Sequence, residues 1–233
     1  MISVIFCGGY GTRMNNGKPG TLKPLIEVAG KAILLHIITI YNKYSIKDFL
    51  LLGGYKIDDL RAFVSKINID GINVKVLDTG DGTPTGGRLK YAENEITTDN
   101  FLLTYGDSLT NFNLNKCLDF KTKTNSDFII SYFNKPIEYG VLKLNQESKV
   151  LGIYEKTFKT PINAGFYILD KRIFSYIKSV NESFEIDVLP RLIDDHNLKI
   201  SSFKVDFWHP MDTPDDQIKL ENILKSDYKI LFK

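Results

Sequence analysis

The sequence is short of cysteine, of net charge and of long hydrophobic runs, and each shortage excludes a class of protein. Cys7 and Cys117 are its only cysteines in 233 residues. We therefore expect a reducing compartment, with neither a disulfide framework nor a cysteine metal site. A net charge of +2 is too small for a dedicated nucleic-acid-binding protein, whose basic excess is large and clustered. No apolar run reaches the roughly 18 residues that a membrane span requires.

We expect no secretion signal, because the first residues do not show a basic region, an apolar core and a small-residue cleavage site in succession. The composition, 43% hydrophobic and 25% charged, is typical of globular proteins with a substantial core. These features predict a cytoplasmic protein that has neither a membrane nor a nucleic acid as its partner.

Short apolar runs alternate with helical patterns in the first half of the chain. Strands are predicted at Ile2–Phe6, Phe49–Leu52, Val74–Leu77 and Phe101–Tyr105, and helices at Ala32–Tyr44, Ile57–Val64 and Gly86–Ala92. Buried strands that alternate with helices form parallel sheets with helices on both faces. The fold class predicted is therefore α/β, with a doubly wound, Rossmann-like sheet.

The second half has strand-like runs without full helices between them. Strands are predicted at Phe128–Phe133, Gly140–Leu144, Val150–Glu155 and Ile162–Leu169, with a hairpin turn at Asn145–Ser148. Helices return at Lys171–Ile177, around Asp187–Asp194 and after Pro214, with a strand at Leu198–Lys204. This pattern predicts a small antiparallel extension, so that the whole sheet is mixed.

Glycines and polar residues follow each of the four predicted parallel strands. The four segments are Gly8–Arg13, Gly53–Lys56, Asp78–Arg88 and Tyr105–Ser108. The carboxyl ends of parallel strands meet at one sheet edge, where α/β proteins bind ligands. Glycines let the backbone approach a phosphate and point N–H groups at it. A phosphate-binding site is therefore predicted at this edge.

The spacing of the first loop weakens two familiar nucleotide motifs. A dinucleotide fingerprint needs a third glycine where Met14 stands. A P-loop needs four residues between its first glycine and Gly-Lys, then Ser or Thr. Here five residues separate Gly11 from Gly17, and Pro19 follows Lys18. The loop instead reads Gly-x-Gly-Thr-Arg, then nine residues, then Lys23-Pro.

This third spacing is accompanied by further motifs along nearly the whole chain. They are Gly8–Arg13, Lys23–Lys31, Gly54–Lys56, Asp78–Gly80, Thr85–Lys90, Thr104–Asp107, Tyr139–Leu142, Glu155–Lys156, Ile162–Phe166 and Phe207–Thr213. In these motifs the sequence resembles the sugar-1-phosphate nucleotidyltransferase family, most of all the glucose-1-phosphate cytidylyltransferases. The Thr85–Lys90 and Phe207–Thr213 runs carry the cytidylyl part of the resemblance.

The resemblance implies one nucleotidyltransferase domain over 1–233, with a nucleotide-binding half at 1–125 and an acceptor-binding half at 126–233. It implies that CTP and a hexose 1-phosphate, α-D-glucose 1-phosphate above all, react with Mg²⁺ to give a CDP-sugar and pyrophosphate. It also implies a homo-oligomer whose product is used in the synthesis of surface polysaccharide. The same chemistry with UTP, dTTP, GTP or another acceptor stays open, as does an inactive regulatory subunit that binds nucleotide.

The resemblance also assigns roles to residues of this chain. Arg13 would hold the β- and γ-phosphates and Lys23 would stabilise the reacting α-phosphate. Asp107 and Asp212 would bind Mg²⁺, although Asp107 by itself also suits a helix cap or a turn. The nucleotide-binding residues implied are Gly8, Gly9, Gly11, Thr12, Arg13, Thr85, Gly86, Gly87, Arg88, Tyr105 and Gly106. The acceptor-binding residues implied are Tyr139, Gly140, Glu155, Lys156, Asn163, Gly165 and Glu185.

Other residues with potential chemistry have simpler interpretations. Cys7 is interpreted as a buried strand-end residue, Lys18 as a loop charge and His36 as a surface or packing residue of a helix. Departures from the family pattern are Ser108, Thr157, Ala164 and Phe184. They concentrate in the acceptor half, so the sequence predicts nucleotide transfer more firmly than it predicts the sugar.

Overall fold

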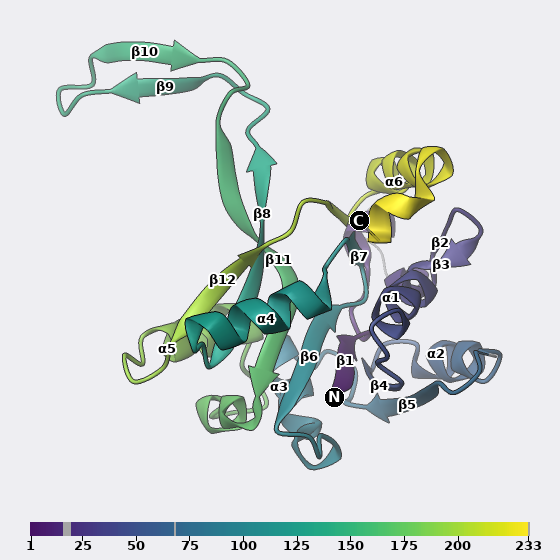
Figure 1. Ribbon diagram of the computed structural model, residues 1–233. Coiled ribbons are helices and arrows are strands. Elements are labelled where there is room, and N and C mark those ends of the chain that lie inside the picture. Colours follow the sequence, from purple (N-terminus) through teal and green to yellow (C-terminus); the bar gives the residue numbers. More distant parts are fainter. Residues whose placement is uncertain (16–19, 68, 233) are drawn as a thin grey trace.

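A seven-stranded mixed sheet runs through the computed structural model, which describes residues 1–15, 20–67 and 69–232 (Figure 1). The strand order is β12-β8-β11-β6-β1-β4-β5. Its strands are β1 (Ile2–Phe6), β4 (Asp48–Gly53), β5 (Asn73–Asp78), β6 (Asn100–Tyr105), β8 (Phe128–Pro136), β11 (Lys159–Asp170) and β12 (Ile200–Lys204). The first four are parallel, β11 is antiparallel to β6 and β8, and β12 is parallel to β8. The predicted mixed α/β sheet is confirmed.

The central strands are buried on both faces because successive side chains point to opposite sides of a strand. Ile5 of β1 lies in one apolar cluster, and Val4 lies in the other. The cluster that holds Ile5 is covered by α1 (Ile33–Asn42), α2 (Ile57–Val64), α4 (Leu114–Thr124) and α6 (Pro214–Ser226). The opposite cluster is covered by α3 (Thr85–Tyr91) and α5 (Leu189–Ile193). Helices on both faces make the sheet doubly wound.

Shorter elements complete the chain. The short strands are β2 (Glu27–Val28), β3 (Lys31–Ala32), β7 (Ser108–Thr110) and β13 (Trp208–Pro210). The short helices are η1 (Thr12–Asn15), η2 (Lys23–Leu25), η3 (Glu93–Glu95), η4 (Lys171–Tyr176), the π-helical η5 (Phe184–Val188) and η6 (Tyr228–Phe232). Among the described residues, no helix has the length and apolar character needed to cross a membrane.

Helix α4 is an element that the apolar pattern did not predict. It begins after Asn113, whose side chain accepts a hydrogen bond from the Lys116 N–H at 3.1 Å. It ends at Asn125, which has a left-handed φ of 48°. Of its side chains, only Leu114 and Cys117 are buried. The helical period of its hydrophobic residues is therefore weak, and its caps are the clearer signal.

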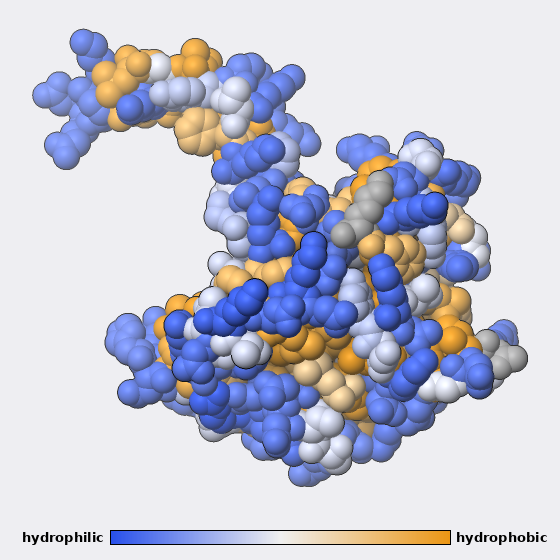
Figure 2. All heavy atoms as spheres, viewed as in Figure 1, coloured by the Kyte–Doolittle hydropathy of each residue, from blue (hydrophilic) through white to orange (hydrophobic). Residues whose placement is uncertain are grey.

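Strands β9 (Val141–Leu144) and β10 (Val150–Tyr154) form a separate hairpin, here named the arm, that projects from the body beyond β8 and β11 (Figure 1). The predicted turn is confirmed, because the Asn145 side chain accepts hydrogen bonds from the N–H groups of Glu147 and Lys149 at 3.0 and 2.8 Å. Leu142, Leu144, Val150 and Ile153 are more than half exposed. Figure 2 shows hydrophobic residues on this arm among hydrophilic ones.

His36 and the two cysteines are packing residues, as predicted for His36 and Cys7. His36 is fully buried; Nε2 lies 2.8 Å from the Val28 carbonyl oxygen and Nδ1 lies 3.0 Å from the Tyr228 hydroxyl. Burial lowers the pKa of His36, so the ring is held neutral. Cys7 and Cys117 are free and buried, and burial raises the pKa of both thiols. Neither is available as a thiolate nucleophile at neutral pH.

Candidate active site

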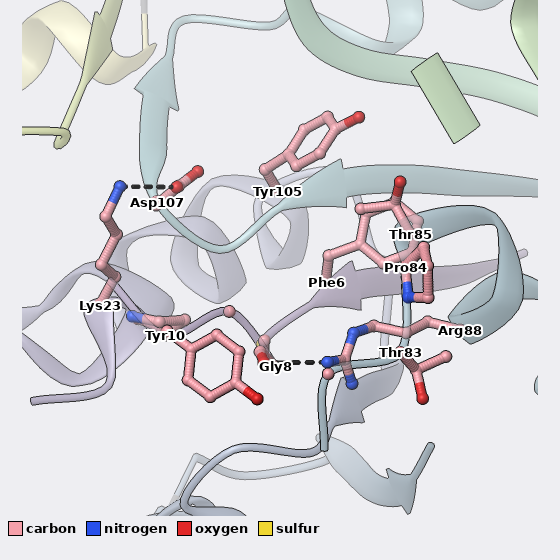
Figure 3. A pocket seen from close by; sticks show the side chains of 14 residues that line it. Phe6, Gly8, Tyr10, Lys23, Thr83, Pro84, Thr85, Arg88, Tyr105 and Asp107 are labelled. Carbon is pink, nitrogen blue, oxygen red and sulfur yellow. Dashed lines mark hydrogen bonds and ion pairs between the residues drawn. The ribbon is translucent and has the colours of Figure 1, made fainter. Parts of the chain in front are cut away.

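Two neighbouring cavities lie at the carboxyl ends of β1, β5 and β6. The first cavity, of about 260 Å³, is lined by Phe6 to Tyr10, Lys23, Pro24, Gly82 to Thr85, Arg88, Tyr105 and Asp107 (Figure 3). The second cavity, of about 330 Å³, is lined by Tyr105, Asp107, Ser108, Asn163 to Gly165, Glu185, Trp208, Pro210 and Asp212. Tyr105 and Asp107 belong to both linings, so the two cavities meet at these residues.

Lys23 lies at this junction between two carboxylates. Its Nζ is 2.7 Å from Asp212 Oδ1 and 3.3 Å from Asp107 Oδ2 (Figure 3 draws the second pair). The lysine side chain is only 10% exposed, while the two aspartates are 35% and 31% exposed. An ammonium group in such a position keeps its interactions strong because little water screens it.

The two aspartates are brought together by a short ladder. β7 pairs antiparallel with β13, so that Ser108 lies opposite Pro210. The Met211 N–H also donates to the Asp107 carbonyl oxygen at 2.8 Å. Residues 107 and 212 are distant in sequence, yet the ladder brings both carboxylates within reach of the Lys23 ammonium.

The carboxylate pair fits a magnesium ion. The two carboxylates lie close together, since a single Nζ contacts both. Among the residues that the structure describes, no group of three or more histidine, cysteine, aspartate or glutamate side chains has the geometry of a metal site. Mg²⁺ commonly takes one or two carboxylates and completes its shell with water and substrate phosphate oxygens. Asp107 and Asp212 would hold it in this way.

Arg88 ties the ends of three strands together. Its guanidinium donates to the carbonyl oxygens of Gly53 at 2.6 Å and Gly8 at 2.9 Å, and to Thr79 Oγ1 at 2.6 Å. The residue is 4% exposed, and burial lowers the pKa of Arg88. A Cβ at Gly8 would lie 2.2 Å from Arg88 Nη1, so only glycine fits there. Arg88 lines the first cavity as an anchor, and its contact with a base or phosphate stays a prediction.

The Gly86–Gly87 pair is explained by helix packing. A Cβ at Gly87 would lie 1.9 Å from the Val180 carbonyl oxygen, and one at Gly86 would lie 2.6 Å from that of Glu182. The Gly87 N–H also donates to the Glu182 carbonyl at 3.2 Å. These glycines let α3 pack closely against the segment before η5, and neither of them lines the first or the second cavity. Their contact with nucleotide remains a prediction.

The rest of the first loop divides into open and packed positions. A Cβ at Gly9 would meet no atom within 4 Å, so its backbone is open toward the first cavity. A Cβ at Gly106 would lie 2.7 Å from Pro24 Cγ, so this glycine seats η2 and with it Lys23. Gly11 and Thr12 lie beyond the lining. Arg13 belongs to η1, but its side chain is outside the described part of the structure, and Lys18 lies outside the described residues.

Glu185 connects the two cavities. Its carboxylate accepts hydrogen bonds from the hydroxyl groups of Thr85 and Ser183, both at 2.7 Å, and from the Tyr105 hydroxyl. Thr85 and Tyr105 line the first cavity, whereas Glu185 lines the second. Hydrogen bonds to one carboxylate therefore link the walls of the two cavities.

Asn163 and Gly165 join Glu185 in the second cavity. The Asn163 amide donates to the Tyr167 hydroxyl at 2.6 Å and accepts from the Gly165 N–H at 2.9 Å. These bonds fix the amide at the cavity wall. Three of the predicted acceptor-binding residues are therefore close together.

The other four predicted acceptor-binding residues lie at the base of the arm. Tyr139 and Gly140 precede β9, and Glu155 and Lys156 follow β10. None of them lines either cavity, and Tyr139 is 79% exposed. The structure does not bring them to Asn163 and Glu185, so their contact with an acceptor stays a prediction.

Gly165→Ala is expected to lower the free energy of unfolding by about 2 kcal/mol. Gly165 has a φ of 75°, and a Cβ there would lie 2.6 Å from Tyr105 Cδ2. Gly152→Ala is the matched control, because its nearest neighbour would lie at 3.8 Å. Urea denaturation of both variants measures the difference. Equal losses would contradict a special requirement at Gly165.

Several lining residues were not singled out from the sequence. Tyr10 stands inside the quoted first motif, and Trp208 stands inside the Phe207–Thr213 motif. Trp208 Nε1 donates to the Ala164 carbonyl at 2.9 Å and so closes one side of the second cavity. Thr83 and Pro84 follow β5 and face Lys23 across the first cavity (Figure 3). Their position in the segment after a predicted parallel strand is the sequence feature that could have identified Thr83 and Pro84 as lining residues.

Known proteins are similar to this chain in sequence and in fold. The Nucleotidyl transferase family model matches residues 2–226. The chain is 32% identical to a probable glucose-1-phosphate cytidylyltransferase of Bacillus subtilis, covering 91% of this chain and 92% of that protein. It is 30% identical to the glucose-1-phosphate cytidylyltransferase of Salmonella typhi, covering 96% and 95%. The crystal structure of HddC from Yersinia pseudotuberculosis complexed with GMP-PN superposes with a TM-score of 0.74 at 25% identity, covering 95% of this chain and 98% of that one. The predicted resemblance is confirmed, and the chain belongs to the nucleotidyl transferase family.

Proposed function

We propose that this sugar-1-phosphate nucleotidyltransferase joins CTP and a hexose 1-phosphate, with α-D-glucose 1-phosphate as the first candidate, to give a CDP-sugar and pyrophosphate. The observation that carries the proposal is Lys23, buried at the junction of two cavities and paired with Asp107 and Asp212. Transfer between two phosphorylated substrates needs positive charge where the substrates meet. At this junction Lys23, together with Mg²⁺ held by the two aspartates, would supply that charge.

In the proposed reaction, an oxygen of the sugar phosphate attacks the α-phosphorus of the triphosphate. One phosphorus–oxygen bond forms, the bond to the β-phosphate bridge breaks, and pyrophosphate leaves. The chemistry needs positioning and charge neutralisation rather than a covalent nucleophile. Lys23 would neutralise charge on the α-phosphate, and the open Gly9 backbone would face the other phosphates. Bound Mg²⁺ would supply further charge neutralisation at phosphate oxygens.

The second cavity would receive the sugar phosphate. Its wall combines a carboxylate, Glu185, with an amide, Asn163, and an indole, Trp208. Carboxylate and amide groups bind sugar hydroxyls, and an aromatic ring covers the apolar face of a sugar. Glu185 already accepts three hydroxyl hydrogen bonds, so we expect it to offer only its remaining lone pairs.

The relatives named as cytidylyltransferases support CTP and glucose 1-phosphate. The Yersinia structure with GMP-PN keeps a guanine nucleotide as the second candidate. An inactive subunit that binds nucleotide is disfavoured, because Lys23 and both aspartates are present and adjacent.

A substrate panel tests the proposal. We expect pyrophosphate release with Mg²⁺, CTP and glucose 1-phosphate to exceed release with UTP, dTTP, GTP or ATP at least about tenfold, the difference that ~1.4 kcal/mol of discrimination provides. Mannose 1-phosphate serves as the comparison acceptor. A larger rate with GTP would show that the enzyme prefers guanine to cytosine. No turnover with any pair, together with measurable nucleotide binding, would favour the regulatory subunit.

A further inference from the structure

Tyr10 is a cavity residue to which none of the roles above applies. It stands between Gly9 and Gly11 in the loop after β1, lines the first cavity and is 39% exposed. In the view of Figure 3 its ring lies between Lys23 and the side of the cavity that carries Arg88 and Thr83. An exposed aromatic face on a cavity wall suits a flat ligand.

A contact with the ring of Tyr55 holds this ring in position. Its centroid is 5.0 Å from that of Tyr55, with the ring planes at 51°. At the hydroxyl end, a Cβ added to Gly82 would lie 3.4 Å from the Tyr10 oxygen. A hydrogen bond with the Asp81 side chain is the main cause of a raised pKa for the Tyr10 phenol. A ring that is held before a ligand arrives loses little freedom on binding it.

The junction with the second cavity distinguishes the two ends of the first cavity. Lys23 lies at this junction, where the proposed reaction places the α-phosphate. The base and ribose of the nucleotide would therefore extend away from the junction into the rest of the first cavity, which Tyr10 lines.

We propose that Tyr10 covers the base of the bound nucleoside triphosphate by stacking on it, with its ring held against that of Tyr55. This inference rests on the proposed function, because it takes the first cavity as the triphosphate site. Every base presents a π-face, so stacking is tolerant of base identity. Tyr10 therefore adds affinity for CTP and for other triphosphates alike, and it does not select among them.

Isothermal titration with CTP and with inorganic tripolyphosphate, both with Mg²⁺, tests this role. Tyr10→Ala and Tyr10→Leu are expected to weaken CTP binding roughly tenfold, the scale of one lost base–aromatic stack. Tyr10→Phe keeps the ring and should stay within about twofold of the wild type. Tripolyphosphate has no base, so its Kd should be the same for all four proteins.

Tyr91→Ala is the matched control, because Tyr91 is 52% exposed at the far end of α3, and it should bind both ligands as the wild type does. Unchanged CTP affinity in Tyr10→Ala and Tyr10→Leu overturns the role of Tyr10 alone. Equal weakening of CTP and tripolyphosphate also overturns it, because the residue would then shape the loop. A wild type that binds neither ligand overturns the proposed function, and this inference with it.

Discussion

Lys23→Ala is expected to lower kcat for nucleotide transfer by roughly 10²- to 10³-fold, the effect of removing one group that stabilises developing charge. The ammonium is 10% exposed and stands where the two cavities meet. In the Lys23→Ala variant, water at this buried position would stabilise the charge of the reacting phosphate only weakly. Steady-state pyrophosphate release measures the loss, and Lys66→Ala, a change at an exposed residue near the end of α2, should leave kcat unchanged.

A second measurement separates the lysine's charge from a general loss of structure. In the nucleotide-free protein, the Lys23 ammonium contacts both carboxylates and therefore competes with a divalent cation. Removing it should tighten Mn²⁺ binding in a calorimetric titration, and added Mg²⁺ should raise the Tm of the variant more than that of the wild type. Unchanged turnover in Lys23→Ala would show that the proposed mechanism is wrong.

Arg88→Met is expected to lower the free energy of unfolding by about 3 kcal/mol or more, since buried acceptors would lose their donors. The guanidinium satisfies the carbonyl oxygens of Gly8, Gly53 and Gly80 and the Thr79 hydroxyl. Methionine has similar bulk without donors, so the loss reports the hydrogen bonds rather than a cavity. Urea denaturation provides the measurement.

Two further substitutions test whether the loss in Arg88→Met comes from the hydrogen bonds of the guanidinium. Arg88→Lys should recover only part of the loss, because one ammonium cannot reproduce the planar fork that reaches three strand ends. Arg61→Met changes an arginine whose side chain is 51% exposed, and we expect a cost below about 0.5 kcal/mol. A similar cost for Arg61→Met and Arg88→Met would contradict the anchoring role of Arg88.

The sheet was predictable where apolar runs end in glycine or aspartate. Strand β1 and helix α2 have the predicted bounds, because their hydrophobic patterns are strong and because glycines follow β1 and precede α2. Helix α4 was missed because it buries only two side chains. The two-residue strands β2 and β3 are likewise too short for a period to appear.

The place of Asp107 at the sheet edge followed from topology, since it comes shortly after β6. Lys23 stands well beyond the end of β1 and could be placed beside Asp107 only through the resemblance. Asp212 could be placed only through the resemblance, because it depends on the pairing of β7 with β13. The anchoring by Arg88 could not be predicted, since its acceptors are backbone carbonyls that the folded sheet brings together. The glycines of α3 similarly depend on a tertiary contact with Val180.

For the four residues at the base of the arm, a sequence motif predicted a role in the acceptor site, whereas the structure places them away from both cavities. A motif assigned Tyr139 and Glu155 to the acceptor site, but a motif carries no information about how far a ribbon extends. β8 and β11 stay paired from Asn163 out to Lys159, and this length carries the arm away from the sheet (Figure 1). Tyr139 and Glu155 therefore lie beyond the cavity linings.

The place of β11 in the sheet also has a consequence for synthesis on the ribosome. β6 pairs with β1 on one side and with β11 on the other, although β11 begins more than fifty residues after β6 ends. While that stretch is being translated, one edge of β6 has no strand to pair with, and such an edge can pair with another nascent chain. The interior of the sheet is thus completed late, and until β11 emerges the growing polypeptide carries an unpaired strand edge.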